Sequence, residues 1–301
     1  MNNEIKEKYI KAGKIASQAR TYGISLIREG ITLLEVTEKV EKKIIELGGS
    51  FAFPPQISLN NVAAHYCADY DDKTIFKKGD IAKLDVGVMI DGFIGDTAET
   101  ICVGYENDEN YIGNKLIKAS KEALNNAIKI IKPGIHIGEI GKIIQETIKS
   151  YGFSPVRNLS GHGLDKYVFH AKPSIPNFDT GDKTKLEKGF VIAIEPFAST
   201  GKGIIYESSN ANIFSQIAKK PVRSLITKQI LIEIEKYKNM PFTTRWLAYK
   251  FGLQKTNFAL RELLQLGIIR SYPPLPDADN GLVSQAEHTI IIEDKIIVTT
   301  L

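Results

Sequence analysis

Cysteine is nearly absent from this sequence of 301 residues, and its scarcity limits the sites that the chain can build. The two cysteines, Cys67 and Cys102, are too few for a disulfide scaffold or a CxxC metal site. We interpret both as structural thiols in a reducing compartment. Any metal ion must therefore be bound by histidine and carboxylate side chains.

Long apolar runs are also missing. No stretch approaches the roughly 18 apolar residues that a membrane span requires, and the N-terminal segment alternates charged with apolar residues, unlike a signal peptide. A composition of 43% hydrophobic and 25% charged residues supports a buried core and excludes disorder as the main state. We therefore predict a cytoplasmic protein that does not enter the membrane.

Charge is distributed unevenly along the chain. The formal net charge is +4, yet residues 212–272 contain 11 Lys and Arg against three Asp and Glu. This segment predicts amphipathic helices, and turn-forming residues flank it. We predict an inserted basic helical subdomain over 201–272 and a catalytic domain formed by 1–200 and 273–301. The insertion is interpreted either as a cap over the site or as a surface that binds RNA phosphates.

Outside the insertion the sequence contains an internal repeat. The segment IKAGK at 10–14 recurs as IKASK at 117–121, and 30–49 aligns with 134–153 at the apolar positions and at the terminal glycines. Each half therefore predicts two helices followed by β segments. The predicted fold class is α+β, with a pseudo-two-fold antiparallel β-sheet covered by helices on one side.

The strongest β signal is a hairpin with Asp91-Gly92 as its turn. The segments 81–90 and 93–103 flank this dipeptide, which supplies the positive φ angles of a two-residue turn. Pairing from that turn places Asp85 opposite Ala98 and makes Asp96 a diagonal neighbour of Asp85 on the same face. Two carboxylates at this separation can share cations.

Further candidate ligands occur in similar apolar settings. Glu195 and Glu287 lie inside apolar strands, and a shared cation would satisfy four carboxylates that otherwise repel one another. Of the five histidines, His162 lies between two glycines and is the candidate imidazole ligand. His136 begins a predicted helix and is interpreted as a capping residue, whereas His288 points to the face opposite Glu287.

This donor set predicts a reaction class. Carboxylates with one imidazole suit Mn, Co, Fe or Zn, and they do not distinguish among these ions. Two divalent ions that share a water molecule generate hydroxide near neutral pH and polarise a carbonyl group. The residues therefore predict a hydrolase that uses a bridging hydroxide in a two-metal site.

A family resemblance is carried by motifs that occur in order along nearly the whole chain. They are NNVAAHY with His65, LDVGV with Asp85, GDTAET with Asp96, GHGLDKYVFH with His162 and His170, AIEPFAST with Glu195, and AEHTI with Glu287. Together they resemble the methionine aminopeptidase family of pita-bread metallohydrolases. The insertion between Glu195 and Glu287 resembles the winged-helix-like subdomain of the type 2 branch, and the chain resembles its short archaeal form.

The resemblance implies a set of metal ligands and a set of substrate contacts. The implied ligands of two divalent metal ions are Asp85, Asp96, His162, Glu195 and Glu287. His65 would contact the scissile amide and assist the leaving nitrogen, and His170 would hydrogen-bond the carbonyl oxygen. Glu195 would also accept a proton from the bridging water.

By family position, Phe53 and Phe169 would line the pocket for the methionine side chain, although ordinary core packing also explains them. The chain departs from the pattern at Phe169 and at Gln285-Ala286, and this affects the shape of the pocket more than the chemistry.

The resemblance implies removal of N-terminal methionine from peptides and nascent chains that have a small second residue. The basic insertion is a candidate surface for transient contact with the ribosome. We expect the protein to be a monomer. One alternative is a prolidase or aminopeptidase P, but those enzymes carry a large N-terminal domain and here only about 80 residues precede the first ligand. A second alternative is a binding protein that has lost its metal, but all five ligands are present.

Overall fold

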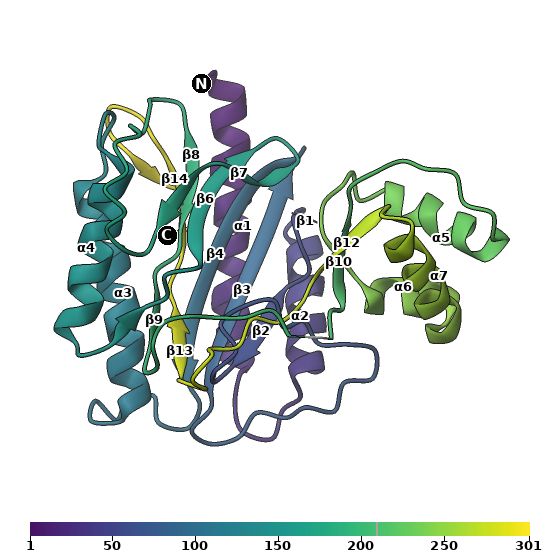
Figure 1. Ribbon diagram of the computed structural model, residues 1–301, viewed down its shortest axis with the longest axis horizontal. Coiled ribbons are helices and arrows are strands. Elements are labelled where there is room, and N and C mark those ends of the chain that lie inside the picture. Colours follow the sequence, from purple (N-terminus) through teal and green to yellow (C-terminus); the bar gives the residue numbers. More distant parts are fainter. Residues whose placement is uncertain (209) are drawn as a thin grey trace.

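The chain consists of two halves with a similar order of elements, as seen in the computed structural model, which describes residues 1–208 and 210–301 (Figure 1). The first half contains α1 Asn3–Leu26, α2 Leu33–Glu46, β1 Ser50–Phe51, β2 Gln56–Leu59, β3 Ile81–Ile90 and β4 Phe93–Cys102. The second half contains α3 Ile112–Ile130, α4 Ile137–Ser150, β5 Ser154–Pro155, β6 Ser160–Asp165, β7 Val168–Pro176, β8 Val191–Ile194, β9 Phe197–Ser199, β13 Val283–Gln285, β14 His288–Ile291 and β15 Ile297–Val298. The predicted two-helix start of each half is confirmed.

The hairpin of β3 and β4 has the predicted register. Asp85 pairs with Ala98 and Gly87 pairs with Asp96, so the two carboxylates are diagonal neighbours on one face. Asp91 and Gly92 have φ angles of 53° and 90°, as a two-residue type I′ turn requires. The turn dipeptide therefore fixes which face of the sheet receives both acidic side chains.

The second helix of each half buries the face that the repeat predicts. On α2 the buried positions Leu33, Val36, Val40 and Ile44 pack on the first half's core, and on α4 Ile137, Ile140, Ile144 and Ile148 pack on the second half's core. These residues are at most 1% exposed. Both helices are followed by a glycine with positive φ, 79° at Gly48 and 81° at Gly152, where a side chain would be strained.

The antiparallel sheet consists of parts that meet between the halves. Strand β3 pairs with β1, β2 and β4, and the five-stranded part has the order β15-β14-β8-β6-β7. A short third part has the order β13-β9-β5. Helix α1 packs against β3 and β4, whereas α3 contacts β13 and α4 contacts β7 (Figure 1). Strands from both halves therefore meet at the centre of the molecule, where α1, α3 and α4 pack against them.

The basic segment forms a smaller lobe with its own core. It contains β10 Ile213–Gln216, α5 Leu225–Glu235, β11 Phe242–Thr243, α6 Thr244–Phe251, α7 Leu253–Gln265 and β12 Ile269–Tyr272. The three predicted helices are confirmed, and the sheet of order β11-β10-β12 was not predicted. Figure 1 shows this lobe to the right of the body. The domain boundaries 1–200, 201–272 and 273–301 stay a prediction.

A buried ion pair joins the lobe to the body. The guanidinium of Arg245, 1% exposed, donates to both carboxylate oxygens of Glu41 at 2.9 and 2.6 Å, and its Nε donates to the Ala68 carbonyl at 3.1 Å. Trp246 Nε1 also donates to Glu41, at 2.7 Å. A bidentate pair with satisfied donors fixes orientation, so this contact holds the lobe against α2.

Within the described residues, no helix combines the length and the apolar character needed to cross a bilayer.

Candidate metal centre

All nine residues singled out in the sequence line one cavity of about 390 Å³. They are Phe53, His65, Asp85, Asp96, His162, Phe169, His170, Glu195 and Glu287. They come from loops and strands of both halves, and the two that are farthest apart in the sequence, Phe53 and Glu287, are separated by 234 positions. The fold therefore brings together every candidate that the motifs indicated.

The four carboxylates converge because each lies on, or next to, a central strand. Asp85 and Asp96 project from the β3–β4 hairpin, Glu195 follows β8, and Glu287 lies between β13 and β14. The main-chain nitrogen of Glu287 donates to the Ala98 carbonyl at 3.0 Å, which places it beside Asp96. Asp96 and Glu287 are 3% and 2% exposed.

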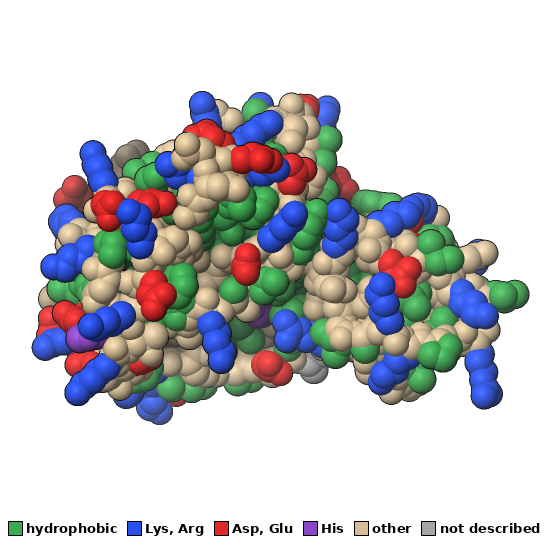
Figure 2. All heavy atoms as spheres, turned by 90° about the horizontal axis from the view of Figure 1, so that it is seen from above, with side chains coloured by type: hydrophobic (Ala, Val, Ile, Leu, Met, Phe, Trp, Pro, Cys, Tyr) green, Lys and Arg blue, Asp and Glu red, His purple; other side chains and the backbone are tan. Residues whose placement is uncertain are grey.

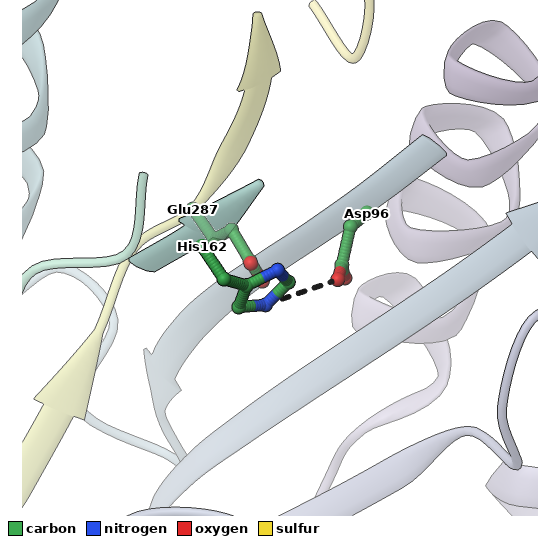
Figure 3. A group of neighbouring side chains, drawn as sticks. All are labelled: Asp96, His162 and Glu287. Carbon is green, nitrogen blue, oxygen red and sulfur yellow. Dashed lines mark ion pairs between the residues drawn. The ribbon is translucent and has the colours of Figure 1, made fainter. Parts of the chain in front are cut away.

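His162 presents an unprotonated nitrogen to these carboxylates. Its Nδ1 lies 3.2 Å from the Gly163 carbonyl, and because a carbonyl only accepts, Nδ1 carries the proton. Nε2 then has a free lone pair, 3.9 Å from Asp96 Oδ2 (Figure 3) and 3.7 Å from Glu195 Oε1. A Cβ atom at Gly161 would lie 2.3 Å from the Ala193 carbonyl oxygen, so the glycine permits close strand packing beside His162.

The carboxylate oxygens are arranged to bind a cation. Asp85 Oδ1, Asp96 Oδ1 and Glu287 Oε2 are buried and have no hydrogen-bond partner among the residues described. One ligand atom each from Asp96, His162 and Glu287 lies within 4.8 Å of the others. Buried acceptors without donors are costly unless a cation neutralises them. The donor set therefore fits a divalent metal ion.

Burial and repulsion alter the acidity of the same groups. Burial raises the pKa of Asp85 to about 7, against a hydrogen bond from Gln285 that lowers it. Burial, reinforced by the neighbouring carboxylates, raises the pKa of Asp96, Glu195 and Glu287 well above the usual range. Without a cation, protons are the means by which these groups lose their mutual repulsion.

His65 is held in a strained backbone conformation at the edge of the cavity. Its φ angle is 66°, in the left-handed region, and its main-chain nitrogen donates to Gln56 Oε1 at 2.8 Å. Its Nδ1 lies 3.3 Å from the Pro273 carbonyl. Burial lowers the pKa of His65 to about 4, so the ring is neutral at pH 7 and Nε2 is a hydrogen-bond acceptor. Strain maintained by such contacts is typical of functional positions.

His170 and the two phenylalanines form the adjoining wall. The His170 ring lies edge-on to the His162 ring, with ring centroids 4.4 Å apart. The centroid of the Phe169 ring lies 4.2 Å from that of the His170 ring. Desolvation, and after it electrostatic interaction with His162, His65 and Arg270, lowers the pKa of His170, so this ring is also neutral. The Phe53 ring occupies the space over Gly87, where a Cβ atom would lie 2.2 Å from it.

The structure adds residues that the sequence did not single out as functional. Gln285 Nε2 donates to Glu195 Oε2 at 3.1 Å, although the motif comparison treated Gln285 only as a departure in pocket shape. Ile213, Pro241 and Tyr272 of the lobe also line the cavity. No local signal marks these three, because only tertiary packing brings the lobe to the site.

The remaining histidines and the cysteines lie outside the cavity, in keeping with their predicted roles. His136 precedes α4, and its Nδ1 lies 2.9 Å from Glu139 Oε1. His288 Nδ1 contacts Thr300 Oγ1 at 2.9 Å, and this ring faces a different cavity. Cys67 and Cys102 are both buried and unpaired.

An α+β fold of two similar halves, with converging carboxylates and one imidazole in its central cavity, defines a metal-dependent hydrolase. The chain matches Metallopeptidase family M24 over residues 7–299. It is 47% identical to the methionine aminopeptidase of Thermococcus onnurineus, covering 96% of this chain and 97% of the relative. The methionine aminopeptidase of Archaeoglobus fulgidus is 45% identical, with 98% and 97% covered.

Solved structures agree with this assignment. The crystal structure of a methionine aminopeptidase from Thermotoga maritima superposes with a TM-score of 0.73 and 26% identity, covering 100% of this chain and 98% of its own. The chain therefore belongs to the methionine aminopeptidases of metallopeptidase family M24 and has their pita-bread fold.

We expect the metal-free chain to become less stable as pH rises from about 6.5 to 8. In this range the folded carboxyls retain protons that the unfolded chain has released, because their pKa values are raised in the fold. The buried histidines do not oppose this trend, because above pH 6.5 they are mostly neutral in the folded and in the unfolded chain. Each additional bound proton lowers the unfolding free energy by about 1.4 kcal/mol per pH unit. Thermal unfolding of chelator-stripped protein at pH 6.5 and pH 8 measures this loss.

Added Mn²⁺ should restore at pH 8 most of the stability that the metal-free chain loses between pH 6.5 and pH 8. A metal-free chain that is more stable at pH 8 than at pH 6.5 would contradict the repulsion described above.

Proposed function

We propose that this chain removes the N-terminal methionine from peptides and nascent proteins, using two divalent metal ions. The proposed ligands are Asp85, Asp96, His162, Glu195 and Glu287, and the proposed metals are Co, Mn, Fe or Zn. One observation carries the proposal: buried carboxylate oxygens without partners face the same cavity as two neutral histidines. Cavities that combine such groups are typical of active sites.

The chain's own residues supply the remaining chemistry. Bound divalent ions would polarise the scissile carbonyl and acidify the attacking water. Glu195, held at Oε2 by Gln285, would accept a proton from this water. His65 Nε2 would accept a hydrogen bond from the scissile amide, and the neutral His170 ring would donate one to the carbonyl oxygen as negative charge develops.

The specificity that we propose follows from the shape of the cavity. Phe53 and Phe169 would contact the methionine side chain, because both line the cavity beside the carboxylates. Pro241 and Tyr272 of the lobe line the same cavity, with the Tyr272 ring centroid 5.9 Å from that of Phe169, and they would narrow the space beyond the scissile bond. A small second residue would therefore be preferred.

We also propose that the chain belongs to the type 2 branch. The support for this assignment is the position of the lobe, since α5, α6 and α7 lie between Glu195 and Glu287 in the sequence. The proposed division into a catalytic domain, 1–200 with 273–301, and an inserted subdomain, 201–272, follows the same feature. The separate core of the lobe supports this division.

Peptide hydrolysis by chelator-stripped protein tests the activity. We expect release of methionine from Met-Ala-Ser after Mn²⁺ or Co²⁺ is added, little release from Met-Phe-Ser, and no cleavage of an Ala-Pro peptide. Metal-dependent cleavage of the proline peptide alone would assign the chain to a prolidase activity. Equal rates on the alanine and phenylalanine peptides would contradict the proposed restriction on the second residue.

Two substitutions separate metal binding from catalysis. Asp85→Asn should lose metal and activity together, because it removes a charged ligand from the centre. His65→Ala should keep both metals and lose turnover, because His65 lies at the edge of the cavity and contacts no proposed ligand. Metal content measured by atomic spectroscopy, alongside kcat and KM, distinguishes the two roles, and full activity in either variant would refute its assignment.

We further propose that the chain is a cytoplasmic monomer that contacts the ribosome transiently through its basic lobe. Lys and Arg side chains are spread over this lobe, with few acidic ones among them (Figure 2). Phosphate binding by such a surface weakens as salt increases. Sedimentation with ribosomes at low salt should therefore decrease when Lys219, Lys220 and Arg223 are reversed to Glu, and unchanged sedimentation would contradict the contact.

A further inference from the structure

The two halves of the sheet meet along a seam with little main-chain pairing. Across residues 1–208 and 210–301, β4 forms a ladder with β3 alone, although it lies against β13 and β14. One main-chain hydrogen bond joins β4 to the segment between β13 and β14, from the Glu287 nitrogen to the Ala98 carbonyl, and another, from the Val283 nitrogen to the Asn60 carbonyl, lies beyond the end of β2. Yet the carboxylates of the centre lie on both sides of this seam. Asp85 and Asp96 belong to the first half, and Glu195 and Glu287 belong to the second half. Other contacts must fix their relative position.

Thr289 of β14 supplies one such contact. Its Oγ1 accepts a hydrogen bond from the Asp96 nitrogen at 2.8 Å and donates one to the Asp96 carbonyl at 2.8 Å. A hydroxyl is a donor and an acceptor at a single atom. Thr289 therefore satisfies both main-chain groups of Asp96, as a paired residue would in an antiparallel ladder.

Thr100 of β4 makes the reciprocal contact toward the other half. Its Oγ1 accepts from the Gln285 nitrogen at 2.9 Å and donates to the Gln285 carbonyl at 2.6 Å. Thr100 is 4% exposed and Thr289 is fully buried, so water does not compete for these bonds. The two threonines thus bridge the seam in opposite directions, Thr289 from β14 to β4 and Thr100 from β4 to β13.

Each threonine binds the backbone of a residue in a different part of the metal centre. Asp96, held by Thr289, clusters with His162 and Glu287 (Figure 3). Gln285, held by Thr100, donates from Nε2 to Glu195 Oε2. The hydroxyls therefore act on the centre through the backbone of Asp96 in one case and through the Gln285 side chain in the other.

We propose that Thr289 and Thr100 are positioning residues, whose hydroxyls replace a main-chain ladder at the seam and hold Asp96 and Glu195 at the separation that metal binding requires. This inference rests on the proposed function, which assigns Asp96 and Glu195 as ligands. Residues that orient metal ligands typically change affinity about 10- to 100-fold when removed. Valine has the shape of threonine but would leave the N–H and C=O groups of the opposing residue unpaired.

Calorimetric titration of the full, chelator-stripped chain with Mn²⁺ tests the proposal. We expect Thr289→Val and Thr100→Val each to weaken Mn²⁺ binding by about 10- to 100-fold, whereas Thr289→Ser and Thr100→Ser retain the hydroxyl and bind close to the wild type. Thr37→Val is the matched control, because Thr37 is equally buried and its hydroxyl donates to the Leu33 carbonyl within α2, away from the seam.

A spectroscopic readout distinguishes positioning from general destabilisation. The visible absorption of bound Co²⁺ reports the ligand geometry, and it should shift in both valine variants and stay unchanged in the serine variants and in Thr37→Val. Gln285→Met removes the amide that contacts Glu195 without touching the seam backbone. It should reproduce the Thr100→Val spectrum. If its spectrum is unchanged, the role of Thr100 is overturned even where Thr100→Val does not fold, because Thr100 acts on Glu195 through the Gln285 amide.

The outcomes separate this inference from the proposed function. Failure of the wild-type chain to bind Mn²⁺ would overturn the proposed function and this inference with it. Normal binding by the wild type and by both valine variants would overturn the inference alone. Serine variants that are as weak as the valine variants would overturn it too, because they would show that side-chain shape, and not the hydroxyl, matters.

Discussion

Four carboxylates repel one another across a single cavity, and the architecture around them is built to withstand this repulsion. Asp85, Asp96, Glu195 and Glu287 line the cavity, and three of their oxygens are buried without a partner among the residues described. Such an arrangement opposes folding unless protons or a cation neutralise it. The surrounding fold must therefore be rigid enough to hold like charges together. Because a rigid fold prevents the carboxylates from moving apart, a divalent ion relieves their repulsion when it binds.

Two features of the fold provide this rigidity. The long β3–β4 hairpin fixes Asp85 and Asp96 on one face by register alone, and the seam threonines connect that hairpin to the strands that carry the other carboxylates. Arg20 adds a positive charge behind the centre: its guanidinium donates to Thr97, whose hydroxyl donates to the Glu287 carbonyl. The lobe completes the cavity, since the Arg245–Glu41 pair holds it where Tyr272 faces the site. This arrangement supports the interpretation of the lobe as a cap.

Local chemistry made much of the site predictable. The Asp91-Gly92 turn determined the register of the hairpin, so the positions of Asp85 and Asp96 could be counted from it. The matched apolar positions of the repeat identified the buried faces of α2 and α4. The positive φ angle of His65 and its contact with Pro273 could not be predicted, because they depend on segments far apart in the sequence. Gln285 was noticed but misjudged, since its amide reaches Glu195 only after two strands have packed.

Local sequence was sufficient to identify which side chains can bind metal, which strand faces carry them, and which family the chain resembles, because turn geometry, strand alternation and motif order are local properties. Tertiary structure decided how those side chains meet. The separation of the carboxylates, the seam hydroxyls and the lobe residues at the cavity all arise from contacts between distant segments. Packing of one half against the other sets these distances, and no local pattern encodes them.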